Sequence, residues 1–358
     1  MGRITTHAMT EMTAVSEFTI DTSEPDLAEL ARFFAAQTND SPELIEERLR
    51  WQRLNPSRTP DVPYAWSARS RNGKLAGAML CIPHRLRKGL RRCTALMSSG
   101  FYVDASFRGA GMGLFLRYRA LRGRYVLYAT TANAQAARLW QWAGAKALAQ
   151  TEYELLCPMR WSSLVEEMSV QRLGPRSAPF ARALGTLANL RRFASWSRST
   201  AELISVRHPE DAVIRSTGDD LQPVRDVAFI RWRFFDAPQV GAQVLRFRDE
   251  KFSADGFVAL THVRRGHRKQ IRTLFLADMW GAISPQAFPS LLHAISKRCQ
   301  QTDDVLAIRC LDPVYLEQAL ATHCVRREFA CPTGWYIDQA AMLGPDPVLI
   351  PTATTELV

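Results

Sequence analysis

The chain has 358 residues, of which 47% are hydrophobic and 23% are charged, and its net charge is +11. This length exceeds what one hydrophobic core usually organises, so two domains are expected. No stretch approaches the roughly 18 apolar residues of a membrane span, and segment 1–20 lacks the apolar region of a signal peptide, which together predict a cytoplasmic protein. The seven cysteines form no Cys-x-x-Cys pair, so we expect reduced thiols, with neither a disulfide framework nor a metal site.

Regular elements of the first half can be predicted from hydrophobic periodicity and turn residues. Ser41 followed by Pro42 has the form of a helix N-cap with proline at the first helical position, and Asn72-Gly73 has the form of a hairpin turn. The expected elements are a strand and a helix over 18–37, a helix over 42–54, strands over 63–70, 75–83 and 93–103, a glycine turn and a helix, a strand over 125–130, a helix over 134–143, and one or two closing strands over 145–156.

The second half of the chain resembles the first when the two are laid together with a shift of about 180 residues. Unlike features then fall into register in the same order along both halves. The matches are Trp51 with Trp232, Gly77 with Gly256, Asp104 with Asp278, and Tyr125 with Val305. Their shared order predicts a duplicated chain.

Segment 169–200, between the matched halves, contains six arginines and no acidic residue, with Leu, Phe and Trp interleaved. It is either an arm for an anionic surface, lipid or nucleic acid, or a connecting helix that packs its apolar side on a domain and exposes its arginines. The connecting helix is favoured. Nucleic acid is therefore not an expected partner, and peripheral membrane contact is left open.

The most informative segment is 101–116, in which a β-rich strand leads through a glycine turn into an apolar helix. Amides in the first turn of a helix are unpaired, glycines let an anion approach them without a Cβ in the way, and the helix dipole favours negative charge. The segment therefore predicts a phosphate site. It is neither a nicotinamide fingerprint, because several strands precede it, nor a Walker loop, because no Lys-Ser or Lys-Thr follows it.

Arg108, Gly111 and Gly113 fit the coenzyme A loop of GNAT-family N-acyltransferases, whose pattern is Arg or Gln, two residues, Gly, one residue, and Gly or Ala. Asn133 and Gly144 further along also resemble that family. The resemblance implies an α+β fold of two GNAT-like domains, each a twisted, mostly antiparallel sheet flanked by helices. It also implies acetyl-CoA or another acyl-CoA as the co-substrate.

The resemblance further implies how the coenzyme is held. The strand at 101–103 is expected to splay from the strand at 125–130, so that the pantetheine arm inserts between them. The amides of 109–113 then hold the pyrophosphate, and Asn133 lies near the pantetheine end. The coenzyme-binding residues implied are Phe101, Tyr102, Val103, Arg108, Gly109, Ala110, Gly111, Met112, Gly113 and Asn133.

The proton chemistry is less well defined by the sequence. Many members of the family have a tyrosine seven residues after the Asn as general acid, but that position is Trp140 here, and an indole cannot donate a proton at neutral pH. Either coenzyme A leaves as a thiolate or another hydroxyl acts, for which Tyr128 is the candidate. Asp104 is the candidate general base, although in the family this position usually turns the chain into the loop. Direct attack in a ternary complex is expected, since no cysteine is placed as a nucleophile.

In the second half, no glycine loop follows Asp278, so we expect no coenzyme A to bind there. Asp278, Trp232 and Arg233 are then candidates for the acceptor pocket, because aromatic faces and guanidinium groups suit sugars and carboxylates. A helix with its aromatic side chains in the core would give the same pattern around Trp232.

These features together predict a tandem GNAT N-acyltransferase with a degenerate second copy, similar to bacterial polysaccharide-biosynthesis GNAT proteins. The expected reaction transfers an acyl group, acetyl by preference, to an amine of a saccharide or small metabolite. The alternative is a non-catalytic acyl-CoA sensor or scaffold, since the acid and base are not identified. The expected boundaries are 15–165 for the acyl-CoA-binding domain, 166–205 for a basic linker, 206–342 for the degenerate domain and 343–358 for a tail.

Overall fold

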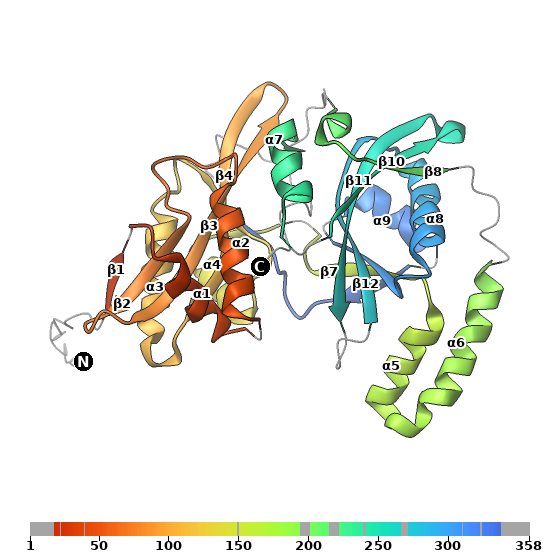
Figure 1. Cartoon of the computed structure of the whole chain (residues 1–358), viewed down its shortest axis with the longest axis horizontal. Helices are drawn as coiled ribbons and strands as arrows, with labels where there is room; N and C mark the ends of the chain where they lie inside the picture. Colours follow the sequence, from red (N-terminus) through yellow and green to blue (C-terminus); the bar gives the residue numbers. More distant parts are fainter. Residues whose placement is uncertain are drawn as a thin grey trace, which may run out of the picture.

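The computed structural model describes residues 18–21, 23–38, 40–148, 150–193, 201–214, 222–238, 241–265, 271–309, 311–322 and 324–337. Two mixed sheets flanked by helices lie side by side, and a helical hairpin projects beyond the second sheet (Figure 1). The predicted α+β class with two copies of one fold is confirmed.

The first sheet has the strand order β1-β2-β3-β4-β5-β15-β6, with β9 paired to the end of β3. Its pairs are antiparallel apart from β4 with β5. Helices α1 and α2 cover one face, and α3 and α4 cover the other. The elements of the first half are β1 (Phe18–Asp21), α1 (Leu27–Ala35), α2 (Pro42–Arg53), β2 (Ala65–Ser70), β3 (Leu75–Lys88), β4 (Arg91–Val103), the short helix η1 (Ala105–Phe107), α3 (Arg108–Arg119), β5 (Val126–Ala129), α4 (Ala134–Trp142), β6 (Lys146–Ala147) and β7 (Tyr153–Pro158).

The second sheet has the order β8-β10-β11-β12-β13-β7-β14, and α8 and α9 cover one of its faces. Only β12 and β13 pair in parallel among its described strands. The elements here are β8 (Glu202–Ser205), η3 (Pro209–Ala212), β9 (Gln222–Pro223), α7 (Val227–Ile230), η4 (Arg231–Phe235), β10 (Gln243–Asp249), η5 (Glu250–Phe252), β11 (Ala254–Arg265), β12 (Ile271–Ala282), η6 (Pro285–Ala287), α8 (Phe288–Cys299), β13 (Val305–Arg309), α9 (Pro313–Leu320), β14 (Val325–Glu328) and β15 (Trp335–Ile337).

The two sheets exchange one strand each. β7, from the first half, lies between β13 and β14, where Pro158 faces Val305. β15, from the second half, lies between β5 and β6, where Trp335 faces Ala147. Apart from this exchange the two strand orders are the same, as the predicted duplication requires. Of the closing strands expected over 145–156, β6 therefore stays in the first sheet and β7 completes the second, which the predicted domain boundaries do not foresee.

Two equivalent tryptophans meet where the halves join. The rings of Trp51 and Trp232 are stacked, with centroids 4.6 Å apart and planes 8° apart. The indole N–H of Trp51 donates to the Trp232 carbonyl at 2.7 Å, and that of Trp232 donates to the Trp51 carbonyl at 2.9 Å. The contact is reciprocal, as expected when two copies of one fold pack about a local two-fold axis. The surrounding core is continuous across both halves.

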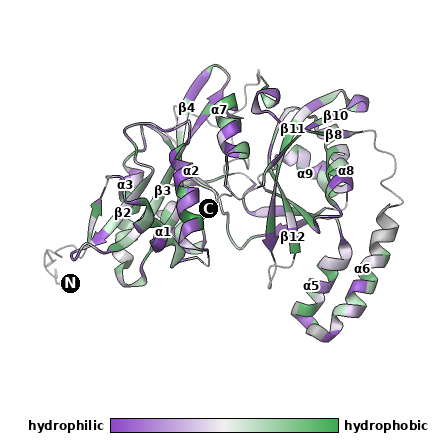
Figure 2. Ribbon diagram, in the orientation of Figure 1, coloured by the Kyte–Doolittle hydropathy of each residue, from purple (hydrophilic) through white to green (hydrophobic). Residues whose placement is uncertain are grey.

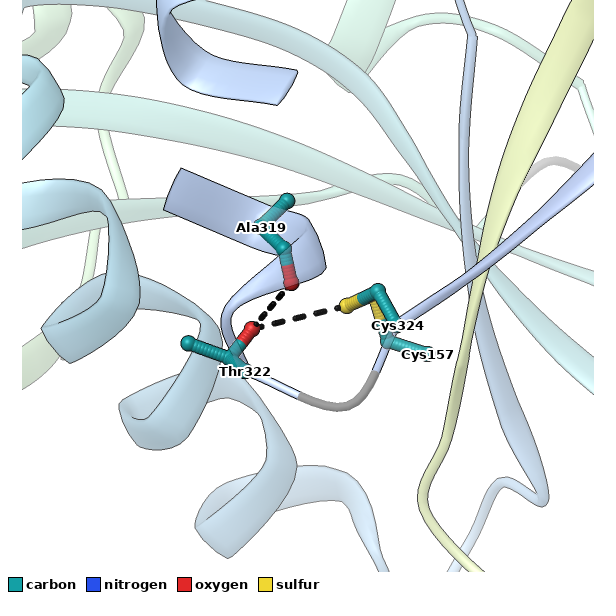
Figure 3. The surroundings of a disulfide bond; sticks show 4 residues. All are labelled: Cys157, Ala319, Thr322 and Cys324. Atoms are coloured by element: carbon teal, nitrogen blue, oxygen red, sulfur yellow. Dashed lines mark hydrogen bonds between the residues drawn. A yellow bond between two sulfur atoms is a disulfide. The ribbon is translucent and has the colours of Figure 1, made fainter. Parts of the chain in front are cut away.

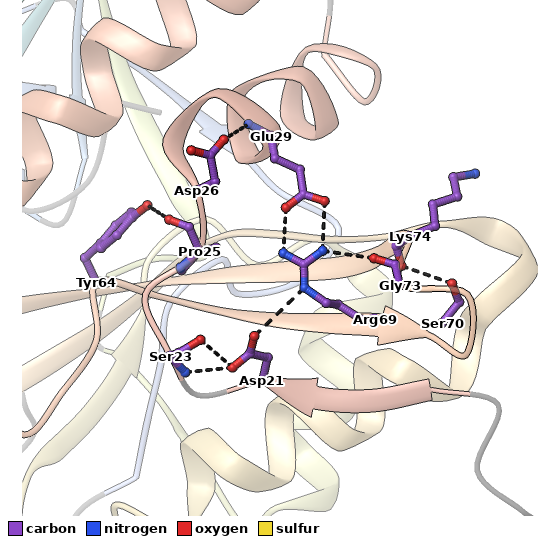
Figure 4. Close-up of polar contacts among 10 residues, drawn as sticks. All are labelled: Asp21, Ser23, Pro25, Asp26, Glu29, Tyr64, Arg69, Ser70, Gly73 and Lys74. Atoms are coloured by element: carbon purple, nitrogen blue, oxygen red, sulfur yellow. Dashed lines mark hydrogen bonds and ion pairs between the residues drawn. The ribbon is translucent and has the colours of Figure 1, made fainter.

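Strand β1 is tied to the sheet and to α1 by Arg69 (Figure 4). The Arg69 guanidinium donates two hydrogen bonds to Glu29, at 2.8 and 2.5 Å, and a third to the Gly73 carbonyl at 3.0 Å. Asp21 at the end of β1 lies 3.9 Å from the same guanidinium. This network fixes the position of β1, which packs on the glycines of α3 described below.

Cys157 and Cys324 form a disulfide, so the expectation that all cysteines are reduced is wrong at these two positions. Cys157 is the second-to-last residue of the exchanged strand β7, and Cys324 directly precedes its neighbour β14. The Thr322 hydroxyl lies 3.6 Å from the Cys324 sulfur and donates to the Ala319 carbonyl at 2.7 Å (Figure 3). Because the cysteines are 167 residues apart in sequence, their spacing gave no sign that the exchange brings them together.

The basic segment begins in a helical hairpin of α5 (Trp161–Leu173), the short turn η2 (Pro175–Ser177) and α6 (Ala178–Phe193). The close approach of its helices depends on Gly185, where a Cβ would lie 2.4 Å from the Ser162 Cα. The favoured interpretation placed the apolar side of this segment on a domain. Instead, α6 packs chiefly on α5, and the hairpin projects from the body of the molecule (Figure 1). The rest of the segment, 194–200, lies outside the described residues. None of the described helices has both the length and the apolar character needed to cross a bilayer.

Candidate active site

Strands β4 and β5 pair over only part of their length. Their parallel register runs from Ala95–Val126 to Met97–Tyr128, and β4 then continues to Val103 with no further pairing to β5. Neighbouring strands normally satisfy each other's amides and carbonyls, so the end of this pairing leaves β4 backbone groups facing the gap. This is the splay that the family resemblance implies.

The hydroxyl of Tyr118 lies at the fork of the two strands. It accepts the Tyr128 N–H at 3.1 Å and donates to the Leu96 carbonyl, so it bridges β5 and β4 within their last two pairs. Tyr118 is fully buried, and burial raises its pKa well above the usual range. Sequence reasoning missed this residue. The available signal was its position four residues after the core residue Leu114, which puts a polar group on the apolar face of α3.

A β-bulge lies beyond the fork in β4. Ala78 pairs with Tyr102 and Leu80 pairs with Ser99, so Gly100 and Phe101 together oppose the single residue between them on β3. Gly100 has φ +53°, and a Cβ there would lie 3.1 Å from a Leu80 methyl group, which is why glycine is needed. The bulge therefore lies in the part of β4 that no longer pairs with β5.

Helix α3 begins at Arg108, after Asp104 and the short helix η1 that follow this strand. Its N-cap residue, Phe107, makes no side-chain capping bond, so no side chain of its own cap covers the first-turn amides. Gly109 and Gly113 face β1, where added Cβ atoms would lie 3.3 and 3.1 Å from the ring of Phe18. These glycines therefore also serve close packing, a role that the phosphate argument did not foresee. The side chain of Arg108 lies outside the described part of the structure.

The other two polar residues predicted around the coenzyme have local structural contacts. The Asn133 side chain accepts the N–H groups of Gln135 and Ala136, at 3.1 and 2.9 Å, and so caps α4. Asp104 accepts the Ser106 N–H at 2.9 Å, which holds the pKa of Asp104 below its usual value. A carboxylate with a lowered pKa is a weak base, so these contacts fit a turn-forming role better than proton removal.

Trp140 and Tyr128 lie on opposite faces of the first sheet. Trp140 is buried between α4 and α3, with its ring edge-on to Phe115 and Tyr118. It is therefore part of the core. Tyr128 is also buried, but on the face that joins the second half, where its ring lies 6.1 Å from that of His84.

Three solved structures share this architecture. A GCN5-related N-acetyltransferase from Anabaena variabilis is 10% identical with a TM-score of 0.52, and the match covers 89% of this chain and 72% of that one. A conserved protein from Enterococcus faecalis, described as a probable N-acyltransferase, is 10% identical with a TM-score of 0.51, and the match covers 89% of this chain and 71% of that one. Saccharomyces cerevisiae N-myristoyltransferase with bound myristoyl-CoA is 12% identical with a TM-score of 0.53, covering 92% and 83%.

The chain adopts the GNAT fold in two copies. No protein-family model matches the sequence, and no curated protein matches it.

The second GNAT copy differs from the first at the corresponding splay. Ala259 pairs with Asp278, as Leu80 pairs with Ser99 in the first copy, so Asp278 lies at the level of Ser99. The predicted match of Asp278 to Asp104 is therefore wrong by several residues. The sequence suggested it because each of the two aspartates follows an apolar β run. Arg225 donates to both oxygens of the Asp278 carboxylate, each at 2.7 Å, and the pair is buried.

Helix α8 takes the place of α3 in the second GNAT copy, but it has no anion cradle. Ser284 and η6 lead into it, and its first residues are Phe288 and Pro289 where α3 has Arg108 and Gly109. Phe288 is buried, and a proline has no N–H to offer a phosphate. That this copy holds no coenzyme stays a prediction.

Of the residues predicted for the acceptor, none is exposed. Trp232 is stacked on Trp51, Asp278 is held by Arg225, and Arg233 is buried in the same π-helical turn as Trp232. The structure thus gathers the predicted coenzyme residues at one end of the first sheet and places the predicted acceptor residues in the joint between the copies. Their roles as acceptor ligands stay predictions.

His84 is a buried polar residue in this joint. Neither of its ring nitrogens has a hydrogen-bond partner in the described structure. Burial, together with the nearby charge of Arg233, lowers the pKa of His84 from 6.5 to about 3. The ring is therefore neutral at physiological pH and packs against the rings of Tyr128 and Phe229.

We expect His84 to make the fold sensitive to acid. Because its pKa is lower in the folded state, its contribution to stability is complete above pH 6.5 and is lost as pH falls from 6.5 toward 3. Between pH 7.5 and pH 5.5 the loss should be about 1.4 kcal/mol in free energy of unfolding. Urea denaturation of the wild type and of His84→Phe at pH 7.5 and pH 5.5 tests this. The free energy of unfolding of the variant should fall less between the two pH values than that of the wild type. An equal fall in both proteins would refute the prediction.

Proposed function

We propose that the chain is an acyl-CoA-dependent N-acyltransferase whose first GNAT copy holds the coenzyme. The observation that carries this proposal is the divergence of β4 from β5 after the Met97–Tyr128 pair, with the uncapped N-terminus of α3 beside it. The first feature offers a row of backbone groups to the amide-bearing pantetheine arm. The second offers first-turn amides to a pyrophosphate.

The residues present fit such a coenzyme. Glycines at 109, 111 and 113 keep side chains away from the first turns of α3, and Arg108 adds a cation at the helix start. The backbone of Phe101, Tyr102 and Val103 would hold the pantetheine arm, and Asn133 lies at the start of the next helix. We propose acetyl as the transferred group. The solved structures named above include both an N-acetyltransferase and an N-myristoyltransferase, so the fold accommodates acyl groups of different length in those proteins.

The proposed reaction is direct attack by a neutral amine on the thioester carbonyl. The C–N bond forms, the C–S bond breaks, and the proton lost by the nitrogen passes to a base or to solvent. A backbone N–H at the β4 bulge would stabilise the oxyanion, since a bulge leaves such groups unpaired. Tyr128, at the fork, is the proposed acid for the leaving sulfur, and Asp104 is disfavoured as the base by its lowered pKa.

We propose an amine on a saccharide or small metabolite as the acceptor. Since Trp232, Arg233 and Asp278 are buried, they would shape the wall between the two copies on the acceptor side instead of meeting the acceptor directly. The alternative is a non-catalytic sensor that binds acyl-CoA. It predicts coenzyme binding without acceptor-dependent release of free thiol when acetyl-CoA is offered with a panel of amines.

Arg108→Glu should weaken coenzyme A binding by at least about tenfold, because it places a negative charge beside the proposed pyrophosphate. Titration calorimetry with coenzyme A measures the change. The matched control is Arg117→Glu, which makes the same charge change in the exposed last turn of the same helix and should bind normally. Equal affinities for both variants and the wild type would remove the coenzyme site from α3.

A further inference from the structure

The projecting hairpin has an apolar stripe that no part of the described structure covers. Phe180, Leu184 and Leu187 follow one another at helical spacing on α6 and are 72%, 48% and 63% exposed. A different side of α6, at Ala181 and Gly185, is buried against α5. The stripe is therefore not the face that holds the hairpin together. Hydrophobic and hydrophilic residues are interleaved along both helices (Figure 2).

The charges at the tip of the hairpin and along α6 are positive, and the hairpin's acidic residues, Glu166 and Glu167, lie on α5. Segment 169–200 has six arginines and no acidic residue. Arg172 and Arg176 are exposed at the tip, beside Leu173, which is 76% exposed. Arg182 is paired with Glu166 of α5 at 2.8 Å, so the charge at the tip itself is not neutralised by that pair.

We propose that this hairpin is a docking surface for an anionic lipid bilayer. The exposed apolar stripe can insert among the acyl chains of such a bilayer, and the arginines at the tip can contact its negatively charged headgroups. A second copy of the chain fits less well, because pairing of identical stripes would bring the arginines together. Nucleic acid fits less well too, because Phe and Leu side chains gain little from a phosphate backbone. The inference does not depend on the proposed acyl transfer.

Vesicle co-sedimentation of the full chain tests the proposal. The protein should bind vesicles of equal parts phosphatidylcholine and phosphatidylglycerol, and bind pure phosphatidylcholine at least about tenfold more weakly. The triple variant Phe180→Ser, Leu184→Ser and Leu187→Ser should lose about tenfold in binding to the anionic vesicles. Since the three side chains are exposed, the variant should fold normally, which its circular dichroism and coenzyme affinity check.

A charge-matched pair of variants separates this surface from the general positive charge of the chain. Arg172→Glu with Arg176→Glu should abolish binding to the anionic vesicles, whereas Arg91→Glu with Arg92→Glu, at the exposed tip of the β3–β4 hairpin, should leave it intact. Equal losses from both pairs would overturn the proposal, as would full binding by the triple serine variant. Conversion of a dimer to a monomer by the serine variant would instead assign the stripe to a second copy. Duplex DNA binding that is lost only with Arg172 and Arg176 would assign the arginines to nucleic acid.

Discussion

Replacing Asp278 with alanine should lower the free energy of unfolding by about 3 to 5 kcal/mol. The carboxylate is fully buried and receives two hydrogen bonds of 2.7 Å from Arg225, whose side chain is only 8% exposed. It also accepts the Met279 N–H at 2.8 Å. Without Asp278 the guanidinium stays buried with no opposite charge from this partner. Urea denaturation at neutral pH measures the loss, with the dependence of the free energy of unfolding on urea concentration (the m value) taken as equal for both proteins.

A surface pair in the neighbouring strands provides the control. Asp255 accepts hydrogen bonds from Arg246 at 2.8 and 2.5 Å, but both side chains are more than a third exposed. Asp255→Ala should therefore cost no more than about 1 kcal/mol. The double variant Arg225→Met with Asp278→Leu should recover most of the lost stability, because no buried charge remains. Equal costs for Asp278→Ala and Asp255→Ala would contradict the role assigned to burial.

Removing the disulfide should be the second large effect. Cys157→Ala with Cys324→Ala should lower the free energy of unfolding by about 2 to 4 kcal/mol, since the bond restricts a long stretch of the unfolded chain. The disulfide also joins β7 to the strand beside it, so it secures the exchanged element. Urea denaturation without reductant compares the free energy of unfolding of the variant with that of the wild type. Adding reductant should make this difference smaller, because it breaks the disulfide of the wild type.

The control for packing is Cys299→Ala, another buried cysteine of the same core cluster, which is a free thiol. It should cost less than the double variant and should leave the response to reductant unchanged. Labelling of the unfolded wild type with a thiol reagent should miss Cys157 and Cys324 until reductant is added. Labelling of both without reductant would show that the bond is absent. Because disulfides are typical of oxidising compartments, this experiment also bears on the predicted cytoplasmic location.

Most of the fold of the first half could be predicted from local signals. Proline after Ser41 and the Asn72-Gly73 turn marked real boundaries, because these residues restrict the backbone directly. The duplication was also visible, since equivalent strands and helices recur with a nearly constant shift. The exchange of β7 and β15 was not visible. Both strands have the same apolar pattern as any closing strand, and nothing local specifies which sheet they complete.

The candidate site divides in the same way. Gly109, Gly111 and Gly113 could be singled out because three glycines close together are unusual where a helix begins, but the structure places them inside α3 and packs two of them on β1. Their role in holding a coenzyme stays a prediction. The contacts of Asp278 and Tyr118 could not be found, because their partners are distant in sequence: Arg225 is 53 residues from Asp278, and Leu96 is 22 residues from Tyr118. The sequence predicts which residues carry polar groups but not which of those groups are satisfied by another part of the chain.

The strand exchange also has a consequence for synthesis on the ribosome. The first sheet holds the proposed coenzyme site, yet it is incomplete until β15 has been translated, close to the end of the described chain. Until then β5 and β6 lack the strand that separates them, and their open edges are exposed to other nascent chains. The first sheet therefore begins to be translated before the second but is completed after it, because β15 follows every described strand of the second sheet in the sequence.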